Sequence, residues 1–283
     1  MRLLVIIPAF NEQAALGGLL REIRALPGEP GVAIETAVVD DGSTDRTAEV
    51  ARAGGARLLR LCRNLGIGGA VQAGLVLAHR EGFDFAVQID GDGQHPPGEL
   101  ARLLAAARGG AGGPGAGAGA GPEDGAPDLV VGTRYRDRAG GFRSTALRRF
   151  GSAWLRLILR VVPRLTISDP TSGFRLYGPR ALRLFADTYP YDFPEPESLA
   201  MARAAGLRVV ETPVTMRERQ GGQSSISGFK SAYYMLKVTV AVVLAYLRTR
   251  RPVPAGGALV EGGAGGGTGR GPEGGPEGGN VLG

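Results

Sequence analysis

The stretch FAVQIDGDGQH, residues 85–95, passes directly from an apolar run into two carboxylates. Residues 85–89 predict a buried strand, and the glycines at 91 and 93 favour a tight loop after it. Asp90 and Asp92 stand two residues apart at the end of that strand, so they can face one hard cation together. Magnesium is usually held in this way, by carboxylates and the phosphates of a substrate. Taken alone, an acidic turn explains the motif equally well, because aspartate and glycine are common turn residues.

Apolar runs alternate with helical stretches along the first half of the chain. The runs predict strands over 3–7, 36–39, 57–61, 85–89 and 129–131, and the stretches predict helices over 12–26, 44–53, 69–80 and 99–107. This alternation predicts an α/β fold with a mostly parallel sheet flanked by helices. Ligands of such sheets bind at the carboxyl ends of the strands. The polar loops 8–12, 40–45 and 90–95 all follow predicted strands, so we expect them to meet at one edge.

Composition predicts one large domain with two glycine-rich additions. The chain has 283 residues and is 43% hydrophobic, which is enough for a sizeable core over residues 1–251. The tracts 109–127 and 252–283 lack apolar residues to offset the entropy of ordering, so we expect a disordered insert and a disordered tail. The formal charge is +6 and almost all cations are arginines, which suit phosphate ligands. Nucleic acid is not expected as a partner, since no binding motif is present.

Membrane and compartment signals are few. Cys62 is the only cysteine, which excludes an intrachain disulfide and a thiolate zinc cluster. The apolar N-terminal run is too short for a signal peptide, and no segment reaches the length of a membrane span, so we expect a cytoplasmic protein. The apolar stretch 232–247, followed by arginines, would span about 24 Å as a helix, short of the ~30 Å bilayer core. It can lie on the membrane surface, or pack on the domain or on a second subunit.

The loop 40–45 has two parts with different expectations. Ser43 or Thr44 is suited to cap the next helix, with Asp45 in its first turn. Capping does not explain Asp40 and Asp41, whose adjacent charges need a neutral or positive partner, such as ribose hydroxyls or a base N–H. A glycine-rich G-x-G-x-x-G loop does not follow the first strand, which argues against a dinucleotide-binding Rossmann domain.

The three loop motifs, PAFNE at 8–12, DDGSTD at 40–45 and DGDGQH at 90–95, together resemble the nucleotide-sugar half of glycosyltransferase family 2. The resemblance runs from about residue 3 to residue 251, and its nearest branch is the dolichol- and polyprenyl-phosphate sugar synthases. It implies a GT-A fold, a single nucleotide-binding α/β domain with a variable acceptor half.

The resemblance also implies roles for residues of the three loops. Asp41 would contact the base or ribose, and Asp40 would support its loop. The residues that would border the nucleotide sugar are Pro8, Ala9, Asn11, Glu12, Asp40, Asp41, Asp90 and Gly91. Asp90, Asp92 and Gln94 match the metal-binding stretch, where Mg²⁺ or Mn²⁺ would bridge to the donor diphosphate. That cation would neutralise charge developing on the leaving group, which makes Asp92 a catalytic candidate. His95 is expected to be a hydrogen-bonding loop residue and not a ligand.

The second half supplies the acceptor side of the resemblance. Asp169, in the motif DPTSGFR, would act as a base or orient the acceptor, with a turn cap as the alternative. Arg134, Arg148 and Ser224 would bind the acceptor phosphate, although Arg148 is also consistent with a solvated helix face. Arg219, on the RQGGQSS loop at 219–225, would close over the diphosphate. The family usually has lysine after that serine, and here Ser225 stands in its place. The motif 195–197, Glu-Pro-Glu, fits loop chemistry or a helix N-terminus.

These observations predict a metal-dependent glycosyltransferase that transfers a sugar from a nucleoside diphosphate to polyprenyl phosphate, with inversion. A soluble or polysaccharide acceptor is the first alternative. A sugar nucleotidyltransferase would need a glycine-rich basic loop after the first strand, which is absent. A non-catalytic nucleotide-binding module is the last alternative, although Asp90, Asp92 and Asp169 are all present. The expected partners are the donor, a lipid phosphate, the membrane surface, and a second copy or a membrane subunit.

Overall fold

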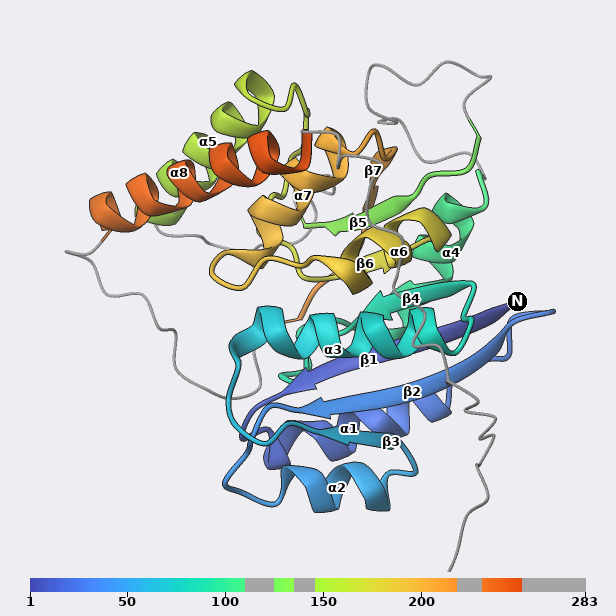
Figure 1. Ribbon diagram of the computed structural model, residues 1–283. Coiled ribbons are helices and arrows are strands. Elements are labelled where there is room, and N and C mark those ends of the chain that lie inside the picture. The colour runs from blue at the N-terminus through green and yellow to red at the C-terminus, as the bar shows by residue number, and fades with distance from the viewer. Residues whose placement is uncertain (110–124, 135–145, 218–230, 251–283) are drawn as a thin grey trace, which may run out of the picture. The chain divides into compact units, whose positions relative to one another are not determined.

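The computed structural model describes residues 1–109, 125–134, 146–217 and 231–250, with side chains omitted at 146–150 and 231–234. Met1–Arg251 forms one compact unit. Its first half alternates strands and helices along the chain (Figure 1): β1 (Arg2–Ala9), α1 (Gln13–Arg24), β2 (Ala33–Asp40), α2 (Thr47–Ala53), β3 (Arg57–Arg60), α3 (Gly66–Arg80), β4 (Phe85–Gln88), a 3₁₀ turn (Pro97–Glu99), α4 (Leu100–Ala107) and β5 (Leu129–Thr133).

The second half contains more helix than strand. Its elements are α5 (Ala146–Val161), β6 (Arg175–Tyr177), α6 (Pro179–Asp187), α7 (Pro194–Ala204), β7 (Val209–Pro213) and α8 (Ser231–Arg250). In the part of the chain that the structure describes, no helix is long and apolar enough to cross a membrane.

Seven strands form one sheet in the order β3-β2-β1-β4-β6-β5-β7. The pairs β1–β2, β1–β4, β2–β3 and β5–β7 are parallel, and only β6 runs antiparallel to its neighbours. The expectation of a mostly parallel α/β sheet is therefore confirmed. In the register, Ala9 pairs with Asp40, so the loops after β1 and β2 begin at the same level of the sheet.

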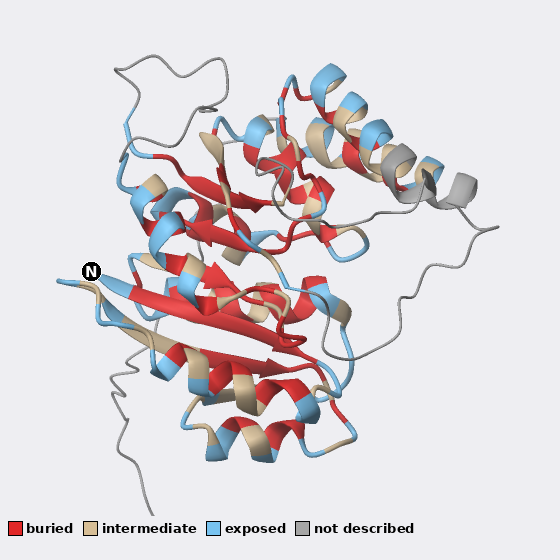
Figure 2. Cartoon of the chain, turned by 180° about the vertical axis from the view of Figure 1, so that it is seen from behind, coloured by how far each residue is buried: buried red, intermediate tan, exposed pale blue. Residues whose placement is uncertain are grey.

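Two apolar cores cover the two faces of the sheet. One joins the sheet to α3, α5, α6, α7 and α8, and the other joins it to α1, α2 and α4 (Figure 1). Buried residues concentrate along the strands, and exposed ones lie on the outer helical surfaces (Figure 2). Since both faces are covered, the edge that carries the carboxyl ends of the strands is where a polar site can form.

Most of the tract 109–127 and all of 252–283 lie outside the described residues. Gly109 and residues 125–127 are described, and Pro127 is buried next to the start of β5. The expectation of disorder in these two tracts stays a prediction.

Candidate active site

The loops that follow β1 and β2 are joined by hydrogen bonds. The Asn11 backbone N–H donates to Ser43 Oγ at 3.0 Å, and Asn11 Oδ1 accepts from the Thr44 N–H at 2.9 Å. Asn11 adopts a left-handed backbone, with φ of 56°. The prediction that Ser43 or Thr44 caps the next helix is wrong, because both hold Asn11 and α2 begins only at Thr47. Asp45 instead accepts from the N–H of Thr47.

The adjacent carboxylates of Asp40 and Asp41 both have partners within the protein. Asp40 is fully buried, accepts from the Ser43 N–H at 2.9 Å and lies 3.3 Å from Arg60 Nε. Asp41 accepts from the backbone N–H groups of Leu65 and Gly66, at 2.7 and 2.9 Å. Arg60, the Ser43 N–H and the backbone at the start of α3 thus relieve the charge repulsion between the two carboxylates, for which the sequence analysis expected a ligand. Asp40 stabilises its loop, and a contact of Asp41 with a base or ribose stays a prediction.

Asp90 and Asp92 lie in an ordered loop after β4. Asp90 is 31% exposed at its side chain, and its Oδ1 accepts from Gln88 Nε2 at 3.0 Å. Asp92 is nearly buried and accepts from the backbone and the side-chain amide of Gln94, at 3.0 and 2.5 Å. His95 Nδ1 accepts from the Asp90 N–H at 3.1 Å, which agrees with a hydrogen-bonding role in the loop.

Two glycines bring this loop against its neighbours. A methyl group at Gly91 would lie 3.1 Å from the Pro8 carbonyl oxygen and 3.5 Å from Ala9 Cβ. A methyl group at Gly173 would lie 3.1 Å from Asp90 Oδ2. The end of β1 and the DPTSGFR loop therefore both meet the Asp90 loop, and a larger residue at either position would push them apart.

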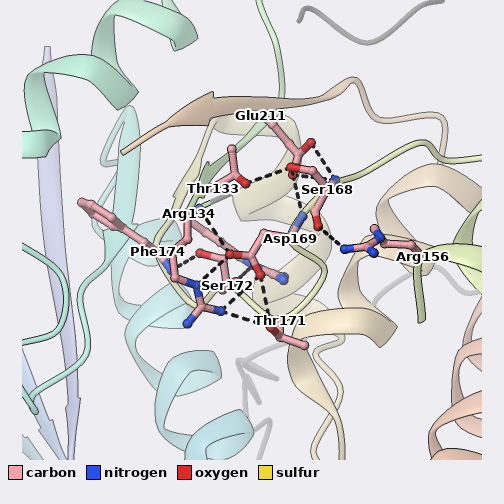
Figure 3. A network of polar contacts seen from close by, with 10 residues as sticks. Thr133, Arg134, Arg156, Ser168, Asp169, Thr171, Ser172, Phe174 and Glu211 are labelled. Atoms are coloured by element: carbon pink, nitrogen blue, oxygen red, sulfur yellow. Dashed lines mark hydrogen bonds and ion pairs between the residues drawn. The ribbon is translucent and has the colours of Figure 1, made fainter. Parts of the chain in front are cut away.

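Asp169 and Arg134 form an ion pair (Figure 3). Arg134 Nε lies 2.9 Å from Asp169 Oδ2, and its Nη2 lies 3.2 Å from Oδ1. The Asp169 side chain is fully buried, whereas that of Arg134 is 21% exposed. The sequence predicted separate roles for the two residues, Asp169 as a base and Arg134 as a phosphate ligand. In the structure their side chains pair with each other, and Arg134 is the one that faces solvent.

Glu211, on β7, binds the backbone of the loop that contains Asp169 (Figure 3). The sequence analysis did not predict it as a site residue. Its carboxylate accepts from the backbone N–H groups of Ser168, at 2.8 Å, and Asp169, at 3.0 Å, and from Ser168 Oγ, at 2.9 Å. Its signal in the sequence is an acidic residue directly after the apolar pair Val209 and Val210. Gln88 has the same kind of signal on β4, a lone amide in a buried run.

Arg175 connects the DPTSGFR loop to the start of α7. The side chain is fully buried and donates to the carbonyl oxygens of Ser172 and Glu195 and to Ser198 Oγ, at 2.8, 2.9 and 2.6 Å. Glu195 lies in the first turn of α7, so the second of its two predicted settings, a helix N-terminus, is the one observed. Burial raises the pKa of its carboxyl group. The negative charge of Asp90 raises this pKa further, and Arg175 opposes the shift.

The donor set of the Asp90 loop fits a hard divalent cation. Asp90 and Asp92 supply carboxylate oxygens, and Gln94 supplies an amide beside them. Within the described ranges, no group of three His, Cys, Asp or Glu side chains is arranged to hold a metal. Two carboxylates suffice for Mg²⁺, which commonly takes its other ligands from water and the phosphates of a substrate.

Three other predicted residues are not placed. Arg219 and Ser224 lie outside the described residues, and Arg148 is within α5 but its side chain is not described. Arg217, the last described residue before the 218–230 segment, lies beside the Asp90 loop, because its N–H donates to the Gln94 carbonyl oxygen at 2.9 Å.

Solved structures identify the class of fold. Glucosyl-3-phosphoglycerate synthase from Mycobacterium tuberculosis, in complex with Mn²⁺, UDP-glucose and phosphoglyceric acid, superposes with a TM-score of 0.59 at 19% identity. The match covers 88% of this chain and 79% of that one. The seven-stranded sheet with helices on both faces is therefore of the GT-A type.

Sequence relatives then identify the family. The model of glycosyl transferase family 2 matches residues 4–117. The undecaprenyl-phosphate mannosyltransferase of Micrococcus luteus is 33% identical over 81% of this chain and 88% of its own length. The polyprenol monophosphomannose synthase of Mycolicibacterium smegmatis is 32% identical over 84% of this chain and 85% of its own length. The chain belongs to glycosyl transferase family 2, and it is a glycosyltransferase.

Proposed function

We propose that this glycosyltransferase transfers a sugar from a nucleoside diphosphate to a polyprenyl phosphate, with a divalent cation and with inversion at the anomeric carbon. The observation that carries the proposal is the meeting of the Asp90 loop with both halves of the site. Gly91 contacts the end of β1, and Gly173 contacts Asp90 from the DPTSGFR loop. The names of the relatives from M. luteus and M. smegmatis support the lipid-phosphate acceptor.

On the donor side, the loops after β1 and β2 would hold the nucleotide, and Asp90, Asp92 and Gln94 would hold Mg²⁺ or Mn²⁺. The bound cation would supply charge stabilisation for the departing nucleoside diphosphate. The solved relative with Mn²⁺ and UDP-glucose supports this assignment. Arg219 would add a second positive charge over the diphosphate from its loop.

On the acceptor side, Arg134 is the group that we expect to meet the lipid phosphate, with Arg148 and Ser224 as further contacts. A phosphate is already ionised at neutral pH, so its oxygen needs no strong base. Asp169 would then hold Arg134 in place. This fits the two hydrogen bonds between the guanidinium and the carboxylate and the full burial of the carboxylate. This favours an orienting role for Asp169 over proton abstraction.

The proposed transfer is a single displacement, in which one bond forms as another breaks. A phosphate oxygen of the acceptor forms a bond to the anomeric carbon while the bond to the diphosphate oxygen breaks. The electron pair of that bond leaves on the nucleoside diphosphate. Attack from the face opposite the leaving group inverts the anomeric configuration.

The proposal is tested by a transfer assay with purified full-length protein, labelled nucleoside diphosphate sugars, Mg²⁺ or Mn²⁺, and polyprenyl phosphate in detergent. Label should enter the organic phase, and Asp92→Ala or excess chelator should reduce transfer by at least about 100-fold. Asp187→Ala, at an exposed position on α6, is the matched control and should remain active.

Full transfer by Asp92→Ala would overturn the metal assignment. Transfer to a water-soluble or polymeric acceptor, with none to the lipid, would favour the alternative acceptor class. An anomeric configuration equal to that of the donor would contradict inversion.

A further inference from the structure

Glu195 is an acidic residue beside the site that the proposed function does not use. It lies in the first turn of α7 and is partly exposed. Among the residues that the structure describes, its carboxylate accepts a hydrogen bond only from its own backbone N–H. Both carboxylate oxygens keep access to solvent, because neither is a fully buried atom without a partner. Glu195 can therefore still accept hydrogen bonds from a ligand.

The other carboxylates near the site differ from Glu195 in this respect. Protein groups donate to those of Asp40, Asp41, Asp92, Asp169 and Glu211. A carboxylate that is partly removed from water is costly unless donors satisfy it, so the oxygens of Glu195 require an explanation.

Arg175 places Glu195 between the donor and acceptor loops. Arg175 pairs with Gln88 across β6 and β4, and Gln88 donates to Asp90. The Arg175 guanidinium donates to the carbonyl oxygens of Ser172, in the DPTSGFR loop, and of Glu195, at 2.8 and 2.9 Å. One buried side chain thus connects the backbone of Glu195 to both loops.

The same arginine leaves the Glu195 carboxylate unneutralised. Its hydrogen bonds go to two carbonyl oxygens and to Ser198 Oγ, and not to the carboxylate. Burial and the negative charge of Asp90 together raise the pKa of Glu195, whereas Arg175 opposes the rise. The carboxyl group of Glu195 therefore lies close enough to Asp90 to sense its charge.

The chemistry of the site indicates which ligand donates to Glu195. A third carboxylate ligand for a cation is not supported, because no three acidic side chains in the described ranges are arranged to hold a metal. An ionised carboxylate can only accept, and hydroxyl groups are neutral donors. Two adjacent hydroxyls of a sugar can donate to the two oxygens of one carboxylate.

The donor sugar has to lie at this junction. In the proposed function its diphosphate is held at the Asp90 loop and the attacking phosphate at Arg134, so the sugar lies between them. We propose that Glu195 binds hydroxyl groups of the donor sugar and selects a neutral sugar against a uronic acid. This rests on the nucleoside diphosphate sugar donor of the proposed function and is independent of the lipid acceptor.

Calorimetry of the full-length protein with Mn²⁺ tests the proposal without sugar transfer. The probes are UDP-glucose, UDP-N-acetylglucosamine and GDP-mannose, together with UDP and GDP. Glu195→Ala should weaken binding of the sugar nucleotide that the wild type binds by at least about tenfold, because hydrogen bonds to a charged group are lost. Binding of the matching nucleoside diphosphate should change by less than about twofold, since it has no sugar to lose a contact.

The matched control is Glu197→Gln, two residues further along α7. The Glu197 carboxylate accepts from the Phe193 N–H at 3.0 Å, a bond that the glutamine oxygen can keep. This variant should bind both kinds of probe like the wild type.

A second variant should gain binding, which damage to the fold does not produce. Glu195→Gln keeps the shape of the side chain and removes its charge. It should bind UDP-glucuronate or GDP-mannuronate at least about tenfold more tightly than the wild type, because the repulsion between two carboxylates is removed.

Equal losses of sugar nucleotide and nucleoside diphosphate binding in Glu195→Ala would overturn the proposal, because Glu195 would then act only on the fold. Unchanged binding of the sugar nucleotide would also overturn it. If sugar binding depends on Glu195 but no polyprenyl phosphate receives sugar, the proposed acceptor fails and the role of Glu195 stands. A wild type that binds none of the three sugar nucleotides would contradict the proposed donor and this proposal together.

Discussion

At Gly173 the backbone approaches the carboxylate of Asp90 so closely that a side chain does not fit without movement. A methyl group there would lie 3.0 Å from Gln88 Nε2 and 3.1 and 3.3 Å from the two oxygens of Asp90. We expect Gly173→Ala to turn Asp90 away from its bond with Gln88. Manganese affinity in the presence of nucleoside diphosphate, measured by calorimetry, should fall by about tenfold while the protein stays folded.

The matched control is Gly98→Ala, in the 3₁₀ turn Pro97–Glu99 that follows the Asp90 loop. No atom lies within 4 Å of the added methyl group at Gly98, so this variant should bind manganese like the wild type. Equal affinity in both variants would show that the position of Asp90 does not control cation binding.

The ion pair of Arg134 and Asp169 is a contact that the sequence motifs did not predict. Both residues were predicted as site residues, but their roles were assigned separately because a motif gives no distances. The buried carboxylate and the partly exposed guanidinium indicate one unit, with Arg134 presented by Asp169. Glu211 was missed for the same reason: its partners, Ser168 and Asp169, are more than 40 residues away in the chain.

At the scale of elements, the loops after β1 and β2 depend on one asparagine. Asn11 has φ of 56°, and its side chain accepts from the Thr44 N–H. We expect Asn11→Ala to lower the free energy of unfolding by about 1–3 kcal/mol, because alanine gains strain and loses this bond. Asn11→Gly loses the bond but adopts the backbone without strain, so it should lose less.

Chemical denaturation of the two variants measures this difference, and nucleotide affinity measures its effect on the site. Both variants should bind nucleotide more weakly than the wild type, since both release the loop after β2. A larger loss of stability in Asn11→Gly than in Asn11→Ala would contradict the argument from backbone strain.

The strands of the first half could be predicted because each is an apolar run bounded by turn residues. The three-residue β6 could not, since it exists only through its antiparallel pairing between β4 and β5. The start of α2 was placed three residues early, because Ser43 and Thr44 bond to Asn11 in a neighbouring loop and not to the helix. Local pattern thus predicts the elements, whereas contacts between loops decide where they begin.

At the scale of the whole molecule, the charge is divided very unevenly. Helices α5 and α8 hold a formal charge of +7, which leaves −1 for all the remaining residues. The site itself contains both signs, with Arg134 against Asp169 and Arg60 against Asp40. Long-range attraction of this protein to an anionic surface would therefore arise from α5 and α8, whereas the donor site would contribute little to it.

This uneven charge distribution predicts that salt reduces transfer to an acceptor in anionic vesicles more than transfer to a water-soluble acceptor. Raising sodium chloride from about 0.05 M to about 0.5 M shortens the screening length to a few ångströms, which weakens attraction between exposed cations and lipid headgroups. We expect transfer to polyprenyl phosphate in anionic vesicles to fall by at least about tenfold. Transfer to a short-chain, water-soluble prenyl phosphate should change by less than about twofold, because that acceptor reaches Arg134 directly from solution. An equal loss with both acceptors would place the salt-sensitive step at the phosphate contacts of the site and not at the surface of α5 and α8.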